Sequence, residues 1–307
     1  MSQRVIAAAS VLAAAVVLAG CSSGSSSSAA AAFGGPAGGP ASPSASEPVV
    51  QNATPAPSGY WTEQRLLAAR EWRPQDWSEP EQGKTPTARE GVKTLRVGAL
   101  FYGDGSSGNH FCTGSVVNSP GQDVIVTAAH CLNDGKGGAG KNDIAFIPAY
   151  ADGSSPFGVW QPAKFIMDPR WVKDHDDNLD VAFVVLKPHD GKNIQQVLGG
   201  NKIAFNPDYG QRVRVTGYPA SANAPIACDN MTGKKDPDFM SFACANFFGG
   251  TSGSPWVTNY DAQTRTGTIV GVLGGYEEGG STPDLSYSDY LGGDIKKLYD
   301  EAIATQG

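Results

Sequence analysis

Three short segments of the sequence contain residues that acid–base and nucleophilic chemistry uses. They are Val126-Thr127-Ala128-Ala129-His130-Cys131, Asp177-Asn178-Leu179-Asp180 and Gly249-Gly250-Thr251-Ser252-Gly253-Ser254-Pro255. A serine hydroxyl is a weak nucleophile at neutral pH unless an adjacent base takes its proton. The imidazole of His130 can do so for Ser252, while a carboxylate accepts the other ring proton and fixes the tautomer. The set predicts nucleophilic catalysis by Ser252.

Asp180 is the predicted carboxylate, because it directly precedes Val181–Leu186, an apolar run typical of a buried strand. Asp176 and Asp177 are the alternatives. The backbone N–H groups of Gly250 and Ser252 are predicted to face a developing oxyanion. A glycine at position 250 suits a sharp turn that presents its amide with no Cβ in the way.

The order of the three residues along the chain is His130, Asp180, Ser252, which is the order of the chymotrypsin class and not of subtilisins or α/β-hydrolases. In its histidine and serine motifs the chain resembles the trypsin-like serine peptidases over about residues 95–307. Val215-Thr216-Gly217-Tyr218-Pro219 and the Thr-Ser-Gly-Ser-Pro form of the serine motif resemble the bacterial glutamyl-endopeptidase branch.

The resemblance implies an all-β, two-barrel chymotrypsin-like fold and an extracytoplasmic serine endopeptidase that works through an acyl-enzyme. A silent trypsin-like surface binding module and an esterase with the same three residues are the alternatives. The resemblance also implies a Cys112–Cys131 disulfide, and with it Cys228–Cys244. From the residues alone, all three pairings of these four cysteines are open.

The chain departs from the family near the serine. Thr251 stands where trypsins have the aspartate of their activation switch, so that switch is expected to be absent. Asn246, Phe247 and Leu273 are the predicted lining of the specificity pocket, which favours an uncharged or apolar side chain. Gly274 stands where the family has the serine that supports the catalytic aspartate.

The elements that must position these residues are short strands. Six β-branched or aromatic runs are separated by turns rich in Gly, Asn and Asp, which favours an all-β barrel or sandwich. The six runs are 97–103, 111–118, 123–128, 180–187, 212–218 and 268–275. One C-terminal helix is predicted, with Asp294 as N-cap and Ile295, Leu298 and Ala302 on one face.

The N-terminus predicts export. Residues 1–20 have a positive start and an apolar run too short to span a bilayer, which is typical of a signal peptide. Leu18-Ala19-Gly20-Cys21 resembles a bacterial lipobox, so lipidation of Cys21 and anchoring to the outer face of the cytoplasmic membrane are expected, with shedding into the medium as the alternative.

Residues 21–59 are the predicted lipidated cysteine and disordered tether, 60–92 an arm or pro-segment, and 93–307 the peptidase domain. Thr62 is expected to cap a short helix that runs to about Arg70.

Composition excludes several classes of function. The net charge of −7 and the absence of a basic run argue against binding to nucleic acid. No zinc or phosphate motif is present, so no cofactor and no metal are expected, and the chain is expected to act as a monomer on a protein or peptide.

The run Asp174–Asp177 lacks the central Gly and terminal Glu of an EF-hand loop, which favours a solvated loop over a calcium site. His110, His175 and His189 are expected to be structural.

Overall fold

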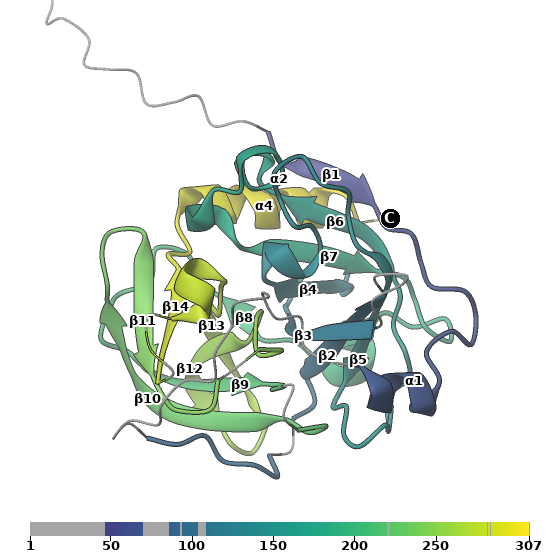
Figure 1. The fold of residues 1–307 in the computed structure, drawn as a ribbon, viewed down its shortest axis with the longest axis horizontal. Helices are drawn as coiled ribbons and strands as arrows, with labels where there is room; N and C mark the ends of the chain where they lie inside the picture. The colour runs from purple at the N-terminus through teal and green to yellow at the C-terminus, as the bar shows by residue number, and fades with distance from the viewer. Residues whose placement is uncertain are drawn as a thin grey trace, which may run out of the picture. The chain divides into compact units, whose positions relative to one another are not determined.

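In the part of the chain that the structure describes, two seven-stranded sheets build the fold, the first from strands within residues 49–186 and the second from strands within residues 202–289 (Figure 1). The computed structural model describes residues 47–69, 86–92, 94–103, 109–219, 222–247, 249–280, 282 and 284–306. Residues 45–307 belong to one unit. The all-β class with a C-terminal helix, predicted from the sequence, is confirmed.

The first sheet has the strand order β1-β6-β7-β4-β3-β2-β5. Its strands are β1 (Val49–Asn52), β2 (Val97–Gly103), β3 (Asn109–Val116), β4 (Val124–Thr127), β5 (Asn142–Pro148), β6 (Pro162–Met167) and β7 (Ala182–Leu186). Every neighbouring pair is antiparallel. Short connections carry the helix α2 (Pro169–Asp174) and the 3₁₀ turns η1 (Ala129–Cys131) and η2 (Asp177–Leu179).

The second sheet has the order β14-β11-β10-β9-β12-β13-β8 and forms the green and yellow strands in Figure 1. Its strands are β8 (Lys202–Ile203), β9 (Arg212–Gly217), β10 (Ile226–Lys234), β11 (Phe239–Ala243), β12 (Pro255–Asp261), β13 (Thr266–Val272) and β14 (Leu285–Asp289). The helix α3 (Ile194–Leu198) precedes it, and the 3₁₀ turn η3 (Tyr276–Gly279) joins β13 to β14.

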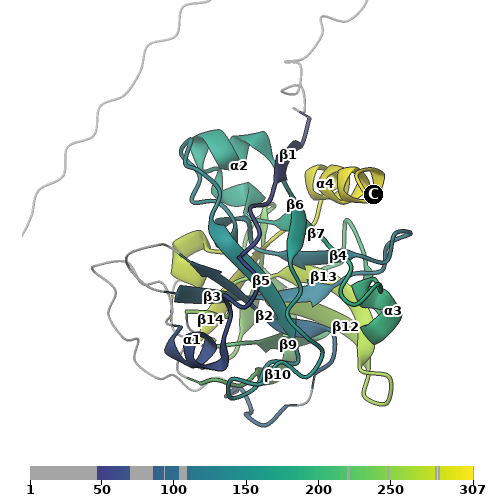
Figure 2. The same cartoon turned by 90° about the vertical axis from the view of Figure 1, so that its right-hand side faces the viewer.

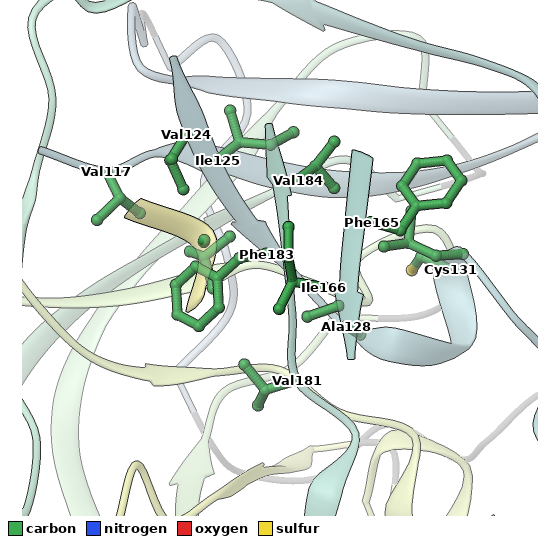
Figure 3. Packing of buried hydrophobic residues seen from close by; sticks show 14 of the residues in the cluster. Val117, Val124, Ile125, Ala128, Cys131, Phe165, Ile166, Val181, Phe183 and Val184 are labelled. Atoms are coloured by element: carbon green, nitrogen blue, oxygen red, sulfur yellow. The ribbon is translucent and has the colours of Figure 1, made fainter. Parts of the chain in front are cut away.

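The strands next to His130 and Asp180, β4 and β7, are buried in the core of the first sheet. Every residue of β4 and of β7 is buried, which explains why their sequences are continuous apolar runs and do not alternate. Figure 3 shows side chains from β4, β6 and β7 packed in this core, among them Ile125, Ile166 and Phe183. Close-packed strands hold their ends rigidly, so the segments next to them, with His130 after β4 and Asp180 before β7, have fixed positions.

The described residues before the peptidase domain include a strand and a helix. Val49–Asn52 form β1, which pairs antiparallel with β6, so the expected disordered tether is wrong for these residues. The open edge of β6 supplies the backbone partners that a sequence pattern cannot reveal. Farther on, Trp61 is 8% exposed and donates from Nε1 to the carbonyl of Asp143 at 2.8 Å.

Thr62 caps the helix α1 (Glu63–Ala68) as predicted, and its hydroxyl accepts a hydrogen bond from the Arg65 N–H. Residues 86–92 run along the second sheet, where Arg89 and Ala227 exchange two backbone hydrogen bonds of 2.7 and 2.9 Å. The described parts of the predicted arm therefore pack on the peptidase domain.

The C-terminal helix α4 (Gly293–Ala304) lies beside β6 and β7, with Ile295, Leu298 and Ala302 buried (Figure 2). Its N-cap is Gly292, so the prediction of Asp294 as the cap is wrong. Asp294 lies in the first turn, where its carboxylate binds Arg170 at 2.8 Å.

None of the helices within the described ranges is long and apolar enough to span a membrane.

Candidate active site

His130 lies in η1, directly after the buried strand β4. Ala128 and Ala129 are fully buried, and the N–H of Ala129 donates to the backbone carbonyl of Asp180 at 3.3 Å. The small side chains let this turn approach the segment that carries Asp180. The His130 side chain keeps 23% of its surface exposed, so the ring is accessible from one side.

His130 and Asp180 form a close pair. The Nδ1 of His130 lies 2.6 Å from Oδ2 of Asp180, and the backbone N–H of His130 donates to Oδ1 at 2.8 Å. The Asp180 carboxylate cannot donate when ionised, so Nδ1 carries the proton in this contact. That tautomer leaves Nε2 as the ring nitrogen with a free lone pair, as a general base requires.

Asp180 is held from a second direction as well. Its side chain is 1% exposed, and the N–H of Gly275 donates to Oδ2 at 2.7 Å. Three N–H groups therefore compensate the loss of water around the buried carboxylate. The predicted choice of Asp180 agrees with this geometry, while Asp176 instead caps η2 by accepting from the N–H of Asn178.

The serine segment packs against the same part of the first sheet. The carbonyl of Ser252 accepts from the N–H of Thr113 at 2.7 Å, and the Sγ of Cys131 lies 3.9 Å from that carbonyl. Cys131 directly follows His130, so the backbone of Ser252 and the histidine turn are neighbours. The N–H of Gly253 donates to the carbonyl of Leu273 at 2.7 Å, which ties the segment to the end of β13.

Glycine conformation shapes the serine turn. Gly250 has φ +91° and Gly253 has φ +86°, values that side chains with a Cβ rarely adopt. A Cβ at Gly253 would collide with the carbonyl of Thr113 and the hydroxyl of Thr127. The hydroxyl of Thr113 also donates to the carbonyl of Gly250 at 3.1 Å. Both glycines are thus required by the backbone path around Ser252.

The predicted oxyanion donors are available. Among the described residues, none accepts a hydrogen bond from the amide of Gly250 or of Ser252. A hydrogen-bond donor without an internal partner near a nucleophile can bind a developing oxyanion.

Both predicted disulfides are present. Cys112–Cys131 joins β3 to η1 with a Cα–Cα distance of 6.1 Å, and Cys228–Cys244 joins β10 to the end of β11 at 6.6 Å. Cys112, His130 and Cys131 offer ligand atoms within 4.8 Å of one another, but both sulfurs are bonded in the disulfide, so this cluster does not form a metal site.

Two of the three predicted pocket residues, Phe247 and Leu273, lie in the hydrophobic core of the second sheet, while Asn246 is partly buried. Leu273 and Phe247 are 2% and 8% exposed, and Phe247 packs edge-on against Phe242. Asn246 precedes them with φ +76°, a backbone conformation that asparagine tolerates better than most residues. Leu273 adjoins the serine turn through the hydrogen bond from Gly253, whereas Asn246 and Phe247 come from the segment after β11.

The other histidines have structural contacts. His175 ends α2 with φ +56°, stacks on Trp171 and contacts the carbonyl of Asp134 through Nδ1 at 2.8 Å. His189 packs on Trp160. The side chain of His110 lies outside the described part of the structure, as do residues 1–20 and Cys21.

The sequence predictions missed Asp289, on β14. Its side chain is fully buried beside Asp180, although no local motif marks it as part of the site. The only sequence signal is an acidic residue within an otherwise apolar and hydroxyl-bearing strand, Leu285–Asp289.

Comparison with known proteins identifies the family of the chain. The trypsin-like peptidase domain family matches residues 112–272, which include the histidine, aspartate and serine segments, and the chain belongs to this family. No curated protein matches the chain.

Solved structures share the fold. The protease Anisep from Arthrobacter nicotinovorans is 27% identical, with a TM-score of 0.64 over 71% of this chain and 100% of that chain. The thermostable serine protease AL20 from an extremophilic microorganism is 30% identical, with a TM-score of 0.62 over 69% and 98% of the two chains. A Glu endopeptidase is 16% identical, with a TM-score of 0.60 over 72% and 99%, and shares the fold alone. The predicted chymotrypsin-like fold is thus confirmed, and the chain is a serine peptidase.

Proposed function

We propose that this chain is an endopeptidase in which Ser252, His130 and Asp180 form the catalytic triad. The observation that carries the proposal is the His130–Asp180 pair, with its 2.6 Å hydrogen bond and its buried carboxylate. The adjoining serine turn supports it, since the Ser252 backbone is bonded to Thr113 and lies beside the residue that follows His130.

The geometry supports the following sequence of steps. Ser252 Oγ bonds to the scissile carbonyl carbon while Nε2 of His130 takes the hydroxyl proton, and the oxyanion binds the amides of Gly250 and Ser252. When the tetrahedral intermediate collapses, the C–N bond breaks and His130 gives its proton to the leaving amine. Water then attacks the acyl-enzyme with His130 again as base, which releases the carboxylic acid and restores Ser252. Asp180 holds the ring and stabilises the imidazolium throughout.

Substrate hydrolysis tests this proposal. Purified protein should cleave an unfolded protein substrate, and Ser252→Ala and His130→Ala should each lower kcat by about 10⁶. Ser119→Ala is a matched control, because Ser119 is buried but lies outside the serine and histidine segments. A cleavage rate that stays unchanged in Ser252→Ala would overturn the proposal. An ester substrate cleaved where no peptide is cleaved would favour an esterase.

For the specificity pocket, we infer a preference for an uncharged or apolar side chain at the scissile bond. The support is the apolar character of Phe247 and Leu273, which are both buried in the hydrophobic core of the second sheet. A peptide library with each residue type before the scissile bond measures the preference. Selective cleavage after Glu or after Lys and Arg would contradict it.

For the location, we propose that Cys21 carries a lipid that anchors the protein to the outer face of the bacterial cytoplasmic membrane. The support is the Leu18–Cys21 motif at the end of the apolar run. Wild-type protein should sediment with membranes, and Cys21→Ala should be found in the medium. Equal partitioning of the two would contradict the anchor.

A further inference from the structure

Asp289 is a buried acid without a hydrogen-bond partner. Its side chain is 0% exposed at the C-terminal end of β14, and neither carboxyl oxygen has a partner among the described residues. An ionised carboxylate in this position would lose its hydration with no compensating hydrogen bond, at a cost of several kcal/mol. A site of this kind favours the neutral carboxylic acid.

The Asp289 carboxyl faces the catalytic pair across Gly274. A Cβ placed on Gly274 would lie 3.4 Å from Oδ1 of Asp289 and 3.6 Å from Oδ2 of Asp180. The N–H of Gly274 donates to the carbonyl of Tyr287 at 3.0 Å, which fixes β14 beside this glycine. The two carboxyl groups therefore border one small space, which is open because residue 274 has no side chain.

The charges around Asp289 are negative. Burial raises the pKa of Asp289 well above its usual range, and the nearby carboxylates of Asp180, Asp177 and Asp176 raise it further. The backbone N–H of Asp180 lowers this pKa, but it makes no hydrogen bond of normal geometry with the Asp289 oxygens. Two carboxyl groups this close share a site in which only one is readily ionised. Three N–H groups bind Asp180 and none binds the carboxyl group of Asp289, so the proton belongs on Asp289.

The elements on the other side of β14 do not neutralise Asp289. Lys235, which precedes β11, lies 3.8 Å from the centroid of the Tyr276 ring and binds the carboxylate of Glu277 at 2.8 Å. Its charge is thus already paired. The hydroxyl of Ser288 donates to the backbone carbonyl of Asp289 and does not reach its carboxyl group.

We propose that Asp289 is a positioning residue: it is held protonated and donates a hydrogen bond to Asp180 across the space over Gly274. It would thereby give the Asp180 carboxylate a fourth hydrogen bond and keep a single negative charge beside His130. The proposal rests on the proposed triad and adds a fourth residue to it, one that does not touch the substrate.

Two variants separate positioning from packing. Asp289→Leu removes the donor at similar volume and should lower kcat by at least about tenfold with KM unchanged, because Asp180 and His130 lose their alignment. Asp289→Asn keeps a neutral donor and should recover most of that loss. Asp123→Asn is the matched control, since Asp123 is also a buried acid but precedes β4 at the end away from His130, and it should leave kcat unchanged.

The pH profile tests the protonation state. If Asp289 is neutral, Asp289→Asn leaves the midpoint of the acid limb of kcat/KM within about 0.3 pH units of wild type. A midpoint about one unit or more lower in Asp289→Asn would show that a second negative charge had been removed, and would overturn the proposal. Wild-type kcat in Asp289→Leu would overturn the positioning role.

Stability gives an arm that needs no activity. An acid whose pKa is raised on folding binds a proton that the unfolded chain releases, so stability falls as pH rises above the unfolded value of about 4. Asp289→Asn should therefore have a higher Tm than wild type at pH 7, and the difference should shrink at pH 3.5. If wild type cleaves nothing but this Tm pattern holds, the proposed function fails while Asp289 is still a neutral acid; a Tm difference that does not change with pH overturns the neutral acid itself.

Discussion

The two halves of the site are held by different means. On the side of the first sheet, His130 and Asp180 are fixed by hydrogen bonds, two between the residues and one from Gly275. On the side of the second sheet, Ser252 is fixed by the backbone, through glycines at φ +91° and +86° and main-chain bonds to Thr113 and Leu273. The first half depends on electrostatics and the second on steric fit, so different substitutions should break them.

Among variants that keep both Ser252 and His130, the largest loss of kcat is expected on the electrostatic side. Asp180→Asn should lower kcat by about 10⁴, as in the chymotrypsin class, because the amide stabilises the wrong tautomer of His130 and cannot offset the imidazolium charge. The fold should be unaffected, which circular dichroism can check.

The control for this variant is Asp176→Asn. Asparagine caps a helical turn as well as aspartate does, so η2 should persist and kcat should stay within about twofold of wild type. Near-normal activity in Asp180→Asn would transfer the orienting role to another carboxylate.

The next largest loss is expected on the steric side. Gly253→Ala should lower kcat by about 100-fold and reduce Tm, because its Cβ meets the carbonyl of Thr113 and must displace the serine turn. Gly210→Ala is the matched control, since Gly210 has φ +70° but nothing within 4 Å of its Cβ position. It should cost about 1 kcal/mol of stability from backbone strain and leave kcat unchanged. Equal effects of the two substitutions would contradict the steric account.

The two disulfides sharpen the comparison. They span similar separations of 19 and 16 residues, so replacing either pair by serine should cost about 2–4 kcal/mol in the free energy of unfolding. Only the Cys112–Cys131 bridge adjoins His130, so its loss should also lower kcat by about tenfold at a temperature where the protein remains folded. Denaturant titration together with kcat measures both effects. A larger fall in kcat from loss of Cys228–Cys244 would contradict the expectation that only the Cys112–Cys131 bridge supports His130.

The smallest effect is expected at a surface ion pair away from both halves of the site. Arg170 holds the pKa of Asp294 below its usual value, so this pair stabilises the fold above about pH 4 and loses its effect as pH falls through the lowered pKa of Asp294. The side chains of Arg170 and Asp294 are 35% and 38% exposed. Solvent screening therefore limits the contribution of the pair to the free energy of unfolding to less than about 1 kcal/mol. Asp294→Asn should therefore lower Tm slightly at pH 7, by an amount that shrinks as the pH falls below about 4, with kcat unchanged. A Tm loss that does not shrink at acidic pH would show that Asp294 acts by something other than its charge.

The sequence predicted what local patterns encode. The six apolar runs correspond to β2, β3, β4, β7, β9 and β13. The predicted catalytic residues lie in turns next to strands, with His130 after β4, Asp180 before β7 and Ser252 before β12. Gly250 could be interpreted from the sequence because a sharp turn suits glycine, whereas the need for glycine at position 253 is seen only in the structure, where its φ is +86°.

What the sequence did not predict depends on distant partners. Val49–Asn52 become a strand only because β6 offers an open edge, although the residues before them are rich in Ser, Ala, Gly and Pro. Helix α4 begins at Gly293 because Asp294 binds Arg170 from α2 instead of capping. The role proposed for Asp289 depends on Asp180, which is far from it in the sequence and is brought near by the fold.

Covalent labelling of Ser252 tests the central claim most directly. Purified protein is treated with a fluorophosphonate, which reacts with serines that a neighbouring base activates, and the adduct is located by mass spectrometry. The account predicts one adduct on Ser252, lost in His130→Ala and strongly slowed in Asp180→Asn. No adduct on Ser252 in the folded wild-type protein, or undiminished labelling in His130→Ala, would contradict it.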